Sequence, residues 1–103
     1  MELIKKLSAM VDDEIEDAKK YAKCALKYRD EDPALAKTFF DLSSDELRHM
    51  SLLHDEVVEE IEKYRKAKGE PPEAMQAVYD YLHERQIESA QGVKHYQSLY
   101  RDM

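Results

Sequence analysis

Two clusters of helix-breaking residues divide the chain, and they constrain its fold more than any other feature. In the first, Asp30-Glu31-Asp32-Pro33, Asp32 can cap a helix whose first residue is Pro33. In the second, Gly69-Glu70-Pro71-Pro72, Gly69 suits the end of a helix and the prolines prevent its continuation. No other proline occurs in the chain. We therefore expect three helices, at about residues 2–29, 33–67 and 72–102.

The composition favours the same fold class. Charged residues make up 38% of the chain and hydrophobic residues 43%, with two glycines in total, which is typical of long amphipathic helices. A chain of 103 residues has room for one domain with a modest core. The predicted fold is all-α: a single domain of three long helices that form an antiparallel bundle.

Charge and cysteine content restrict the partners and the compartment. The net charge of −7 makes nucleic acid an unfavourable partner, because phosphates would be repelled. The single cysteine, Cys24, excludes an intramolecular disulfide framework and a cysteine-rich metal site. No stretch approaches the roughly 18 apolar residues of a membrane span, and the N-terminal segment lacks the apolar region of a signal peptide. We expect a cytoplasmic protein without a membrane or nucleic-acid partner.

Each expected helix carries a stripe at spacings of three and four residues, which is typical of the inner face of a bundle helix. The first stripe is Leu7, Val11, Glu14, Ala18, Tyr21, Ala25 and Tyr28. The second is Leu35, Phe39, Leu42, Glu46, His49, Leu53, Val57, Ile61 and Tyr64. The third is Met75, Val78, Leu82, Ala90, Val93, Tyr96 and Tyr100, blurred in its middle by Arg85, Gln86 and Ser89. Charged or imidazole side chains interrupt the first two stripes only at positions 14, 46 and 49.

These three polar side chains are expected to meet. The midpoint between Glu14 and the Glu46/His49 pair falls near residue 31, so in an antiparallel hairpin all three lie at one level, about 25 Å from the turn. Glu46 and His49 also share a helix face, because they are three residues apart. Two buried carboxylates at one level would repel each other, and a cation between them removes this cost. Mixed carboxylate and imidazole ligands suit iron and manganese, and they can also hold zinc.

The contribution of the third helix stays open. Reflecting the same level through the second turn, near residue 70, leads to Gln91 and Gly92, with Glu88 and His95 one turn to either side. Glu84 is a more distant option. Without a metal, the same positions would form a polar layer in which Glu46 pairs with His49 along one helix. His54 is expected at the surface, and His83 receives no role.

The motif resembles a known family. Glu14, Tyr21 seven residues later, and Glu46-x-x-His49 after a turn resemble the first half of a ferritin-like di-iron domain. The segments Asp-Ala-Lys-Lys-Tyr-Ala (17–22) and Asp-Glu-Leu-Arg-His-Met (45–50) are similar to rubrerythrins. The resemblance covers residues 3–65 well and 72–103 loosely. It implies an iron cofactor, di-iron in the family's manner, and a ferroxidase or peroxidase-type oxidoreductase whose metal ligands are Glu14, Glu46, His49 and, by position, Glu88.

The chain departs from this family in one main respect. It has no fourth helix and no second Glu-x-x-His, and it lacks the four cysteines of a rubredoxin module. Two chains that pair would each supply half of the ligands, as in the short ferritins of encapsulin shells, so we expect a homodimer or a larger even oligomer. One metal within a single chain, with Glu88 or His95 as an extra ligand, is the second arrangement. A metal-free helical interaction or assembly protein on the same scaffold is the alternative function.

Overall fold

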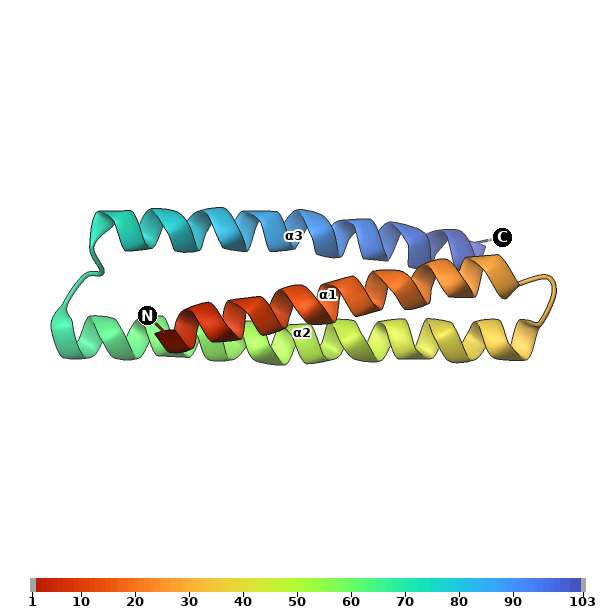
Figure 1. Ribbon diagram of the computed structural model, residues 1–103, viewed down its shortest axis with the longest axis horizontal. Coiled ribbons are helices and arrows are strands. Elements are labelled where there is room, and N and C mark those ends of the chain that lie inside the picture. Colours follow the sequence, from red (N-terminus) through yellow and green to blue (C-terminus); the bar gives the residue numbers. More distant parts are fainter. Residues whose placement is uncertain (1, 103) are drawn as a thin grey trace.

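The computed structural model describes residues 2–102, with the backbone alone at residues 74, 75 and 78. It contains three helices, α1 (Glu2–Tyr28), α2 (Pro33–Lys68) and α3 (Glu73–Asp102), and no strand in this part of the chain. The chain reverses direction at both connections, so α2 runs opposite to α1 and α3 (Figure 1). The all-α prediction is confirmed, and each predicted helix differs from the observed one by a single residue at one end.

Both connections have the local chemistry that the sequence predicts. The carboxylate of Asp32 accepts a hydrogen bond from the backbone N–H of Leu35 at 3.2 Å, and Pro33 takes the first position of α2. At the other end, the backbone N–H of Gly69 donates to the carbonyl of Arg65 at 2.9 Å. Gly69 has a φ of 83°, a conformation that side chains disfavour, so glycine is the residue suited to this position.

Helix α1 is the central element of the packing. It packs closely against both α2 and α3, whereas the backbones of α2 and α3 approach each other at few places. Ala18, Ala22 and Ala25 of α1 are fully buried, and their small side chains let the neighbouring helices approach closely. The main core cluster contains Val11, Ile15, Ala18, Ala22 and Val93, against which Leu47, Met50, Leu53 and Tyr96 pack. Within the described residues, no helix is long and apolar enough to cross a membrane.

The buried face of α1 is rotated from the predicted stripe. Ile4, Ser8, Ile15 and Ala22, which the stripe omits, are buried. Leu7, Glu14, Tyr21 and Tyr28, which the stripe includes, are only partly buried. The reason is that α1 packs on two neighbours, so its buried face extends toward α3 as well as toward α2. On α3, Ala90 and Val93 are buried as expected, while Met75 and Val78 lie outside the described side chains.

Buried polar side chains fix α3 against the hairpin. The hydroxyl of Ser43 donates to the carbonyl of Ala18 at 2.7 Å and accepts from Nε2 of Gln97 at 2.9 Å. Nε2 of Gln86 donates to the carbonyl of Ser8 at 3.2 Å. Gln86, which blurs the apolar pattern of the third segment, therefore belongs to the buried face. Its amide is satisfied there by hydrogen bonds across the interface.

Candidate metal centre

Glu14 of α1 meets Glu46 and His49 of α2 midway along the hairpin. Nδ1 of His49 lies 3.7 Å from Oε2 of Glu14 and 3.7 Å from Oε2 of Glu46. One ligand atom from each residue lies within 4.8 Å of the other two. These distances agree with the prediction that the three side chains occupy one level. The hairpin brings α1 to this level, and the i,i+3 spacing places Glu46 and His49 on one face of α2.

This carboxylate–histidine group lies at the side of the bundle, not in its interior as the stripes predict. The exposed fraction of the side chain is 26% for Glu14, 19% for Glu46 and 44% for His49. Helix α3 packs on a different side of α1, where its Gln86 side chain contacts Ser8 and Asp12. The group consequently remains open on the side of the hairpin that α3 leaves uncovered.

One oxygen of the group lacks a partner. Oε2 of Glu14 is buried and has no hydrogen-bond partner within the described part of the chain. The 3.7 Å contact with His49 is too long for a hydrogen bond. A buried, unpaired carboxylate oxygen is costly, and a cation removes that cost. The two carboxylates and the imidazole therefore fit a metal ion of the iron, manganese or zinc type.

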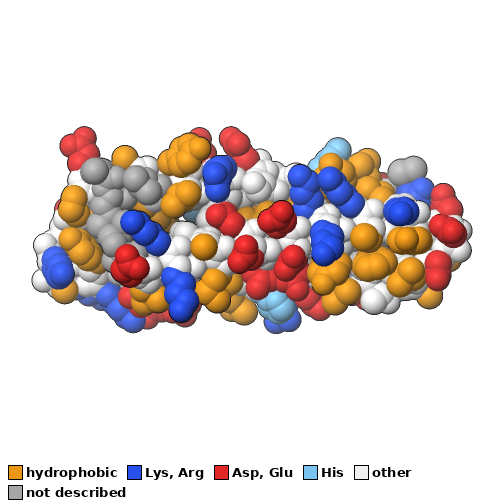
Figure 2. All heavy atoms as spheres, in the orientation of Figure 1, with side chains coloured by type: hydrophobic (Ala, Val, Ile, Leu, Met, Phe, Trp, Pro, Cys, Tyr) orange, Lys and Arg blue, Asp and Glu red, His pale blue; other side chains and the backbone are white. Residues whose placement is uncertain are grey.

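Apolar side chains surround the group. Figure 2 shows acidic side chains gathered midway along α1 and α2, beside a histidine, with apolar side chains to either side. We call this surface the open hairpin face; its exposed apolar members are Leu3, Met10, Leu35 and Leu42. Leu35, Leu42 and His49 succeed one another at seven-residue intervals, which places them on one side of α2. Exposed apolar side chains thus lie on the same surface as the metal candidates.

The structure does not bring Glu88 to this group. Glu88 is exposed and lies two residues from buried Gln86 and two from buried Ala90, so it occupies the opposite side of α3. It lines a groove of about 700 Å³ between α1 and α3, together with His95. Among the described residues, the group within ligand distance contains Glu14, Glu46 and His49 alone. Neither Glu88 nor His95 is placed to complete a site within one chain.

Sequence reasoning missed a second pair of close ligand atoms. Nε2 of His54 and Nδ1 of His83 are 2.9 Å apart, across α2 and α3. The sequence does contain a sign of this pair. In an antiparallel pair of helices joined near residue 70, position 54 lies level with position 86, which is within one turn of His83. Neither histidine lies on one of the three stripes, so the apolar pattern does not single the pair out.

Comparisons of the chain with family models, with curated proteins and with solved structures find no match. The likeness to ferritin-like proteins stays a prediction that rests on the residues quoted above.

Proposed function

We propose that the protein is a ferritin-like iron-binding protein that oxidises Fe(II), with dioxygen or peroxide as the electron acceptor. The observation that carries the proposal is the convergence of Glu14, Glu46 and His49, with ligand atoms within 4.8 Å and one carboxylate oxygen lacking a partner. The order of these residues along the chain adds the resemblance to rubrerythrins. Manganese or zinc are the other ions that this donor set accommodates.

Each residue has a definite task in this function. Glu14 and Glu46 supply two negative charges, which balance those of one divalent ion, and His49 adds a nitrogen donor through its imidazole. Iron held by these residues would supply one-electron transfer, in which Fe(II) is oxidised and dioxygen or peroxide is reduced. Three protein ligands leave coordination positions open. The 44% exposure of the His49 side chain keeps the group accessible to a small oxidant.

A second copy of the chain is proposed to cover the open hairpin face. Leu3, Met10, Leu35 and Leu42 expose apolar surface around the group, and burial of such surface drives association. In a twofold dimer the same face meets itself, so both copies contribute their carboxylates and imidazoles to one di-iron centre. Sedimentation equilibrium should give a homodimer or a larger even oligomer. A 12.1 kDa monomer at micromolar concentration would contradict this part of the proposal.

A metal-free assembly protein is the alternative, and one observation favours it. Nδ1 of His49 is 3.7 Å from a carboxylate oxygen of each glutamate, so a protonated imidazole would balance part of their charge without an ion. The open hairpin face would then serve as an interaction surface, with the carboxylate–histidine group as its polar centre. The two functions make opposite predictions about added iron.

The deciding experiment is a set of anaerobic thermal melts with and without Fe(II). Fe(II) at a hundred times its Kd should raise the free energy of unfolding of wild type by about 2.7 kcal/mol. It should raise that of His49→Ala little. The matched control His95→Ala should behave like wild type. Equal gains in wild type and His49→Ala, or no gain in wild type, would favour the assembly protein. Oxygen consumption then tests turnover separately. Iron binding without consumption of dioxygen or peroxide would retain the metal site and refute the oxidation.

A further inference from the structure

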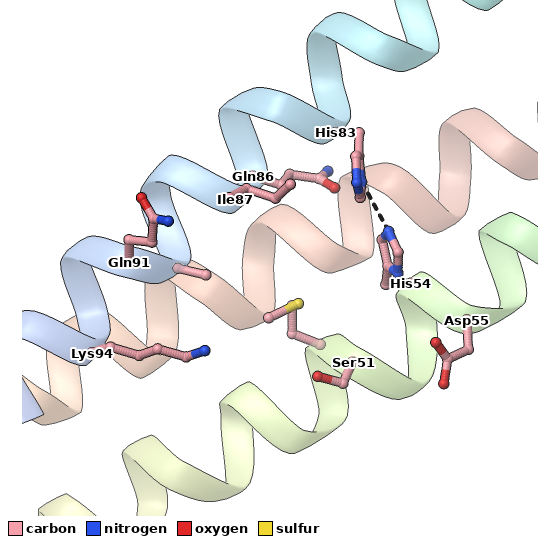
Figure 3. Close-up of a pocket in the computed structure, with 10 residues that line it drawn as sticks. Ser51, His54, Asp55, His83, Gln86, Ile87, Gln91 and Lys94 are labelled. Carbon is pink, nitrogen blue, oxygen red and sulfur yellow. Dashed lines mark hydrogen bonds between the residues drawn. The ribbon is translucent and has the colours of Figure 1, made fainter.

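A groove of about 290 Å³ separates α2 from α3 on the other side of the molecule. The backbones of these two helices approach each other at few places, and the helices meet through side chains such as Ser43 and Gln97. His54 of α2 and His83 of α3 point toward each other across the groove, and Asp55 lies beside them on α2 (Figure 3). Neither histidine belongs to the carboxylate–histidine group.

The spacing of the two imidazoles matches that of ligands on one ion. Their facing nitrogens are 2.9 Å apart. Two nitrogens bound at right angles to one ion, each at about 2.05 Å, are also about 2.9 Å apart, and a tetrahedral angle widens this only to about 3.3 Å. An ion can therefore replace the shared hydrogen once the rings turn so that both nitrogen lone pairs point at it.

Aromatic stacking holds both rings in place before an ion arrives. The ring of His83 stacks on Tyr79, with centroids 5.7 Å apart and planes 12° from parallel. The ring of His54 stacks on His83 at 4.6 Å and 26°.

We propose that His54 and His83 form a second metal site, which takes a late first-row divalent ion such as Zn²⁺ or Cu²⁺ and ties α3 to α2. Two imidazoles without a carboxylate ligand favour these ions, which bind nitrogen more strongly than iron or manganese do. Water in the open groove completes the coordination sphere. The ion adds a link between α2 and α3 to the hydrogen bond of Ser43 with Gln97 and the stacking of Phe40 on Tyr100. This proposal is independent of the iron site, because no residue is shared.

The test uses the full chain carrying His49→Ala, which removes the imidazole of the carboxylate–histidine group. Calorimetric titration with Zn²⁺ at pH 7.5 should show one equivalent bound per chain. Adding His54→Ala or His83→Ala should weaken binding at least about tenfold, as loss of a ligand should cost no less than loss of its outer-shell support. Adding His95→Ala, the matched control on the other groove, should change it less than about twofold. No zinc uptake by His49→Ala, or uptake that survives both substitutions, would overturn the proposal and leave a hydrogen-bonded histidine pair.

Copper gives a second, spectroscopic readout. The electron paramagnetic resonance spectrum of one equivalent of Cu²⁺ on His49→Ala should show coupling to two imidazole nitrogens. With His54→Asn or His83→Asn added, it should show coupling to one. A spectrum without coupling to two nitrogens in the His49→Ala protein would refute the site. A positive result here together with no iron effect in wild type would refute the proposed function alone.

Discussion

Replacing Glu14 by glutamine should change stability in opposite directions with and without metal. A ligand oxygen of Glu14 lies within 4.8 Å of one from Glu46, and Oε2 of Glu14 has no hydrogen-bond partner in the described chain. Two unit charges at 4.8 Å repel by about 0.9 kcal/mol in water and by about 3.5 kcal/mol at an effective dielectric constant of 20. The partial exposure of both side chains favours the lower figure. Without metal, the free energy of unfolding of Glu14→Gln should therefore be about 1 kcal/mol higher than that of wild type.

Metal should reverse this order. A hundredfold excess of Fe(II) over Kd stabilises wild type by about 2.7 kcal/mol, whereas the glutamine variant has lost a charged ligand and should gain little. Urea denaturation at pH 7.5, with a chelator or with Fe(II) under anaerobic conditions, measures both differences. Glu16→Gln is the matched control, because Glu16 is exposed on α1 outside the group. Its stability should stay within about 0.5 kcal/mol of wild type in both conditions.

Two results would refute the reasoning. If metal-free Glu14→Gln is less stable than wild type by more than about 1 kcal/mol, then Glu14 makes a favourable pair with His49, and the group is a polar layer that needs no ion. If iron stabilises the glutamine variant as strongly as wild type, then the ion binds elsewhere. Either result removes Glu14 from the proposed ligand set.

Three further predictions concern the scaffold. Ser43→Ala should destabilise the protein by about 2 to 3 kcal/mol in urea, because it leaves a buried glutamine N–H without its acceptor, whereas exposed Ser44→Ala should cost nothing. Gly69→Ala should lower the free energy of unfolding by about 1 to 3 kcal/mol, because Gly69 has a φ of 83°. Gly92→Ala should raise it by up to about 1 kcal/mol, because Gly92 is in mid-helix with free space around it. Equal thermal shifts for the two variants would contradict this. Burial, and then the neighbouring His83, lower the pKa of His54 in the folded protein, so the unfolded chain binds a proton at a higher pH than the folded one. In the presence of a chelator, the free energy of unfolding should therefore fall as the pH drops from 6.5 toward the lowered pKa. His54→Asn should weaken this dependence on pH.

The sequence predicts those features that depend on local chemistry or on simple helix geometry. The caps at Asp32 and Gly69 involve residues within four positions of each other, so their types are sufficient to place the ends of α2. The meeting of Glu14 with Glu46 and His49 follows from a tight turn and a constant rise per residue, which fix their level, and from their places on the stripes, which fix the faces that meet. The helix class and these contacts follow without knowledge of the tertiary packing.

The placement of α3 could not be predicted in this way. Its apolar pattern is interrupted by Gln86, whose burial depends on acceptors on α1 that are far away in the sequence. Without that contact, the side of α3 that faces α1 is ambiguous. Glu88 is predicted as a ligand from its level along the bundle and from its match to the third-helix glutamate of ferritin-like proteins. Level says nothing about rotation, and Glu88 lies on the opposite side of the helix.

The stripe on α1 combines two sets of residues at seven-residue intervals, and the structure separates them. Val11, Ala18 and Ala25 are at most 1% exposed, because α2 and α3 pack on them. The set of Leu7, Glu14, Tyr21 and Tyr28 stays partly exposed beside the open hairpin face. A stripe of this width suits a helix with neighbours on a third side as well. The proposed second copy would provide that neighbour. The same contact would bury Glu14, as its place in the stripe predicts, and would complete the metal site.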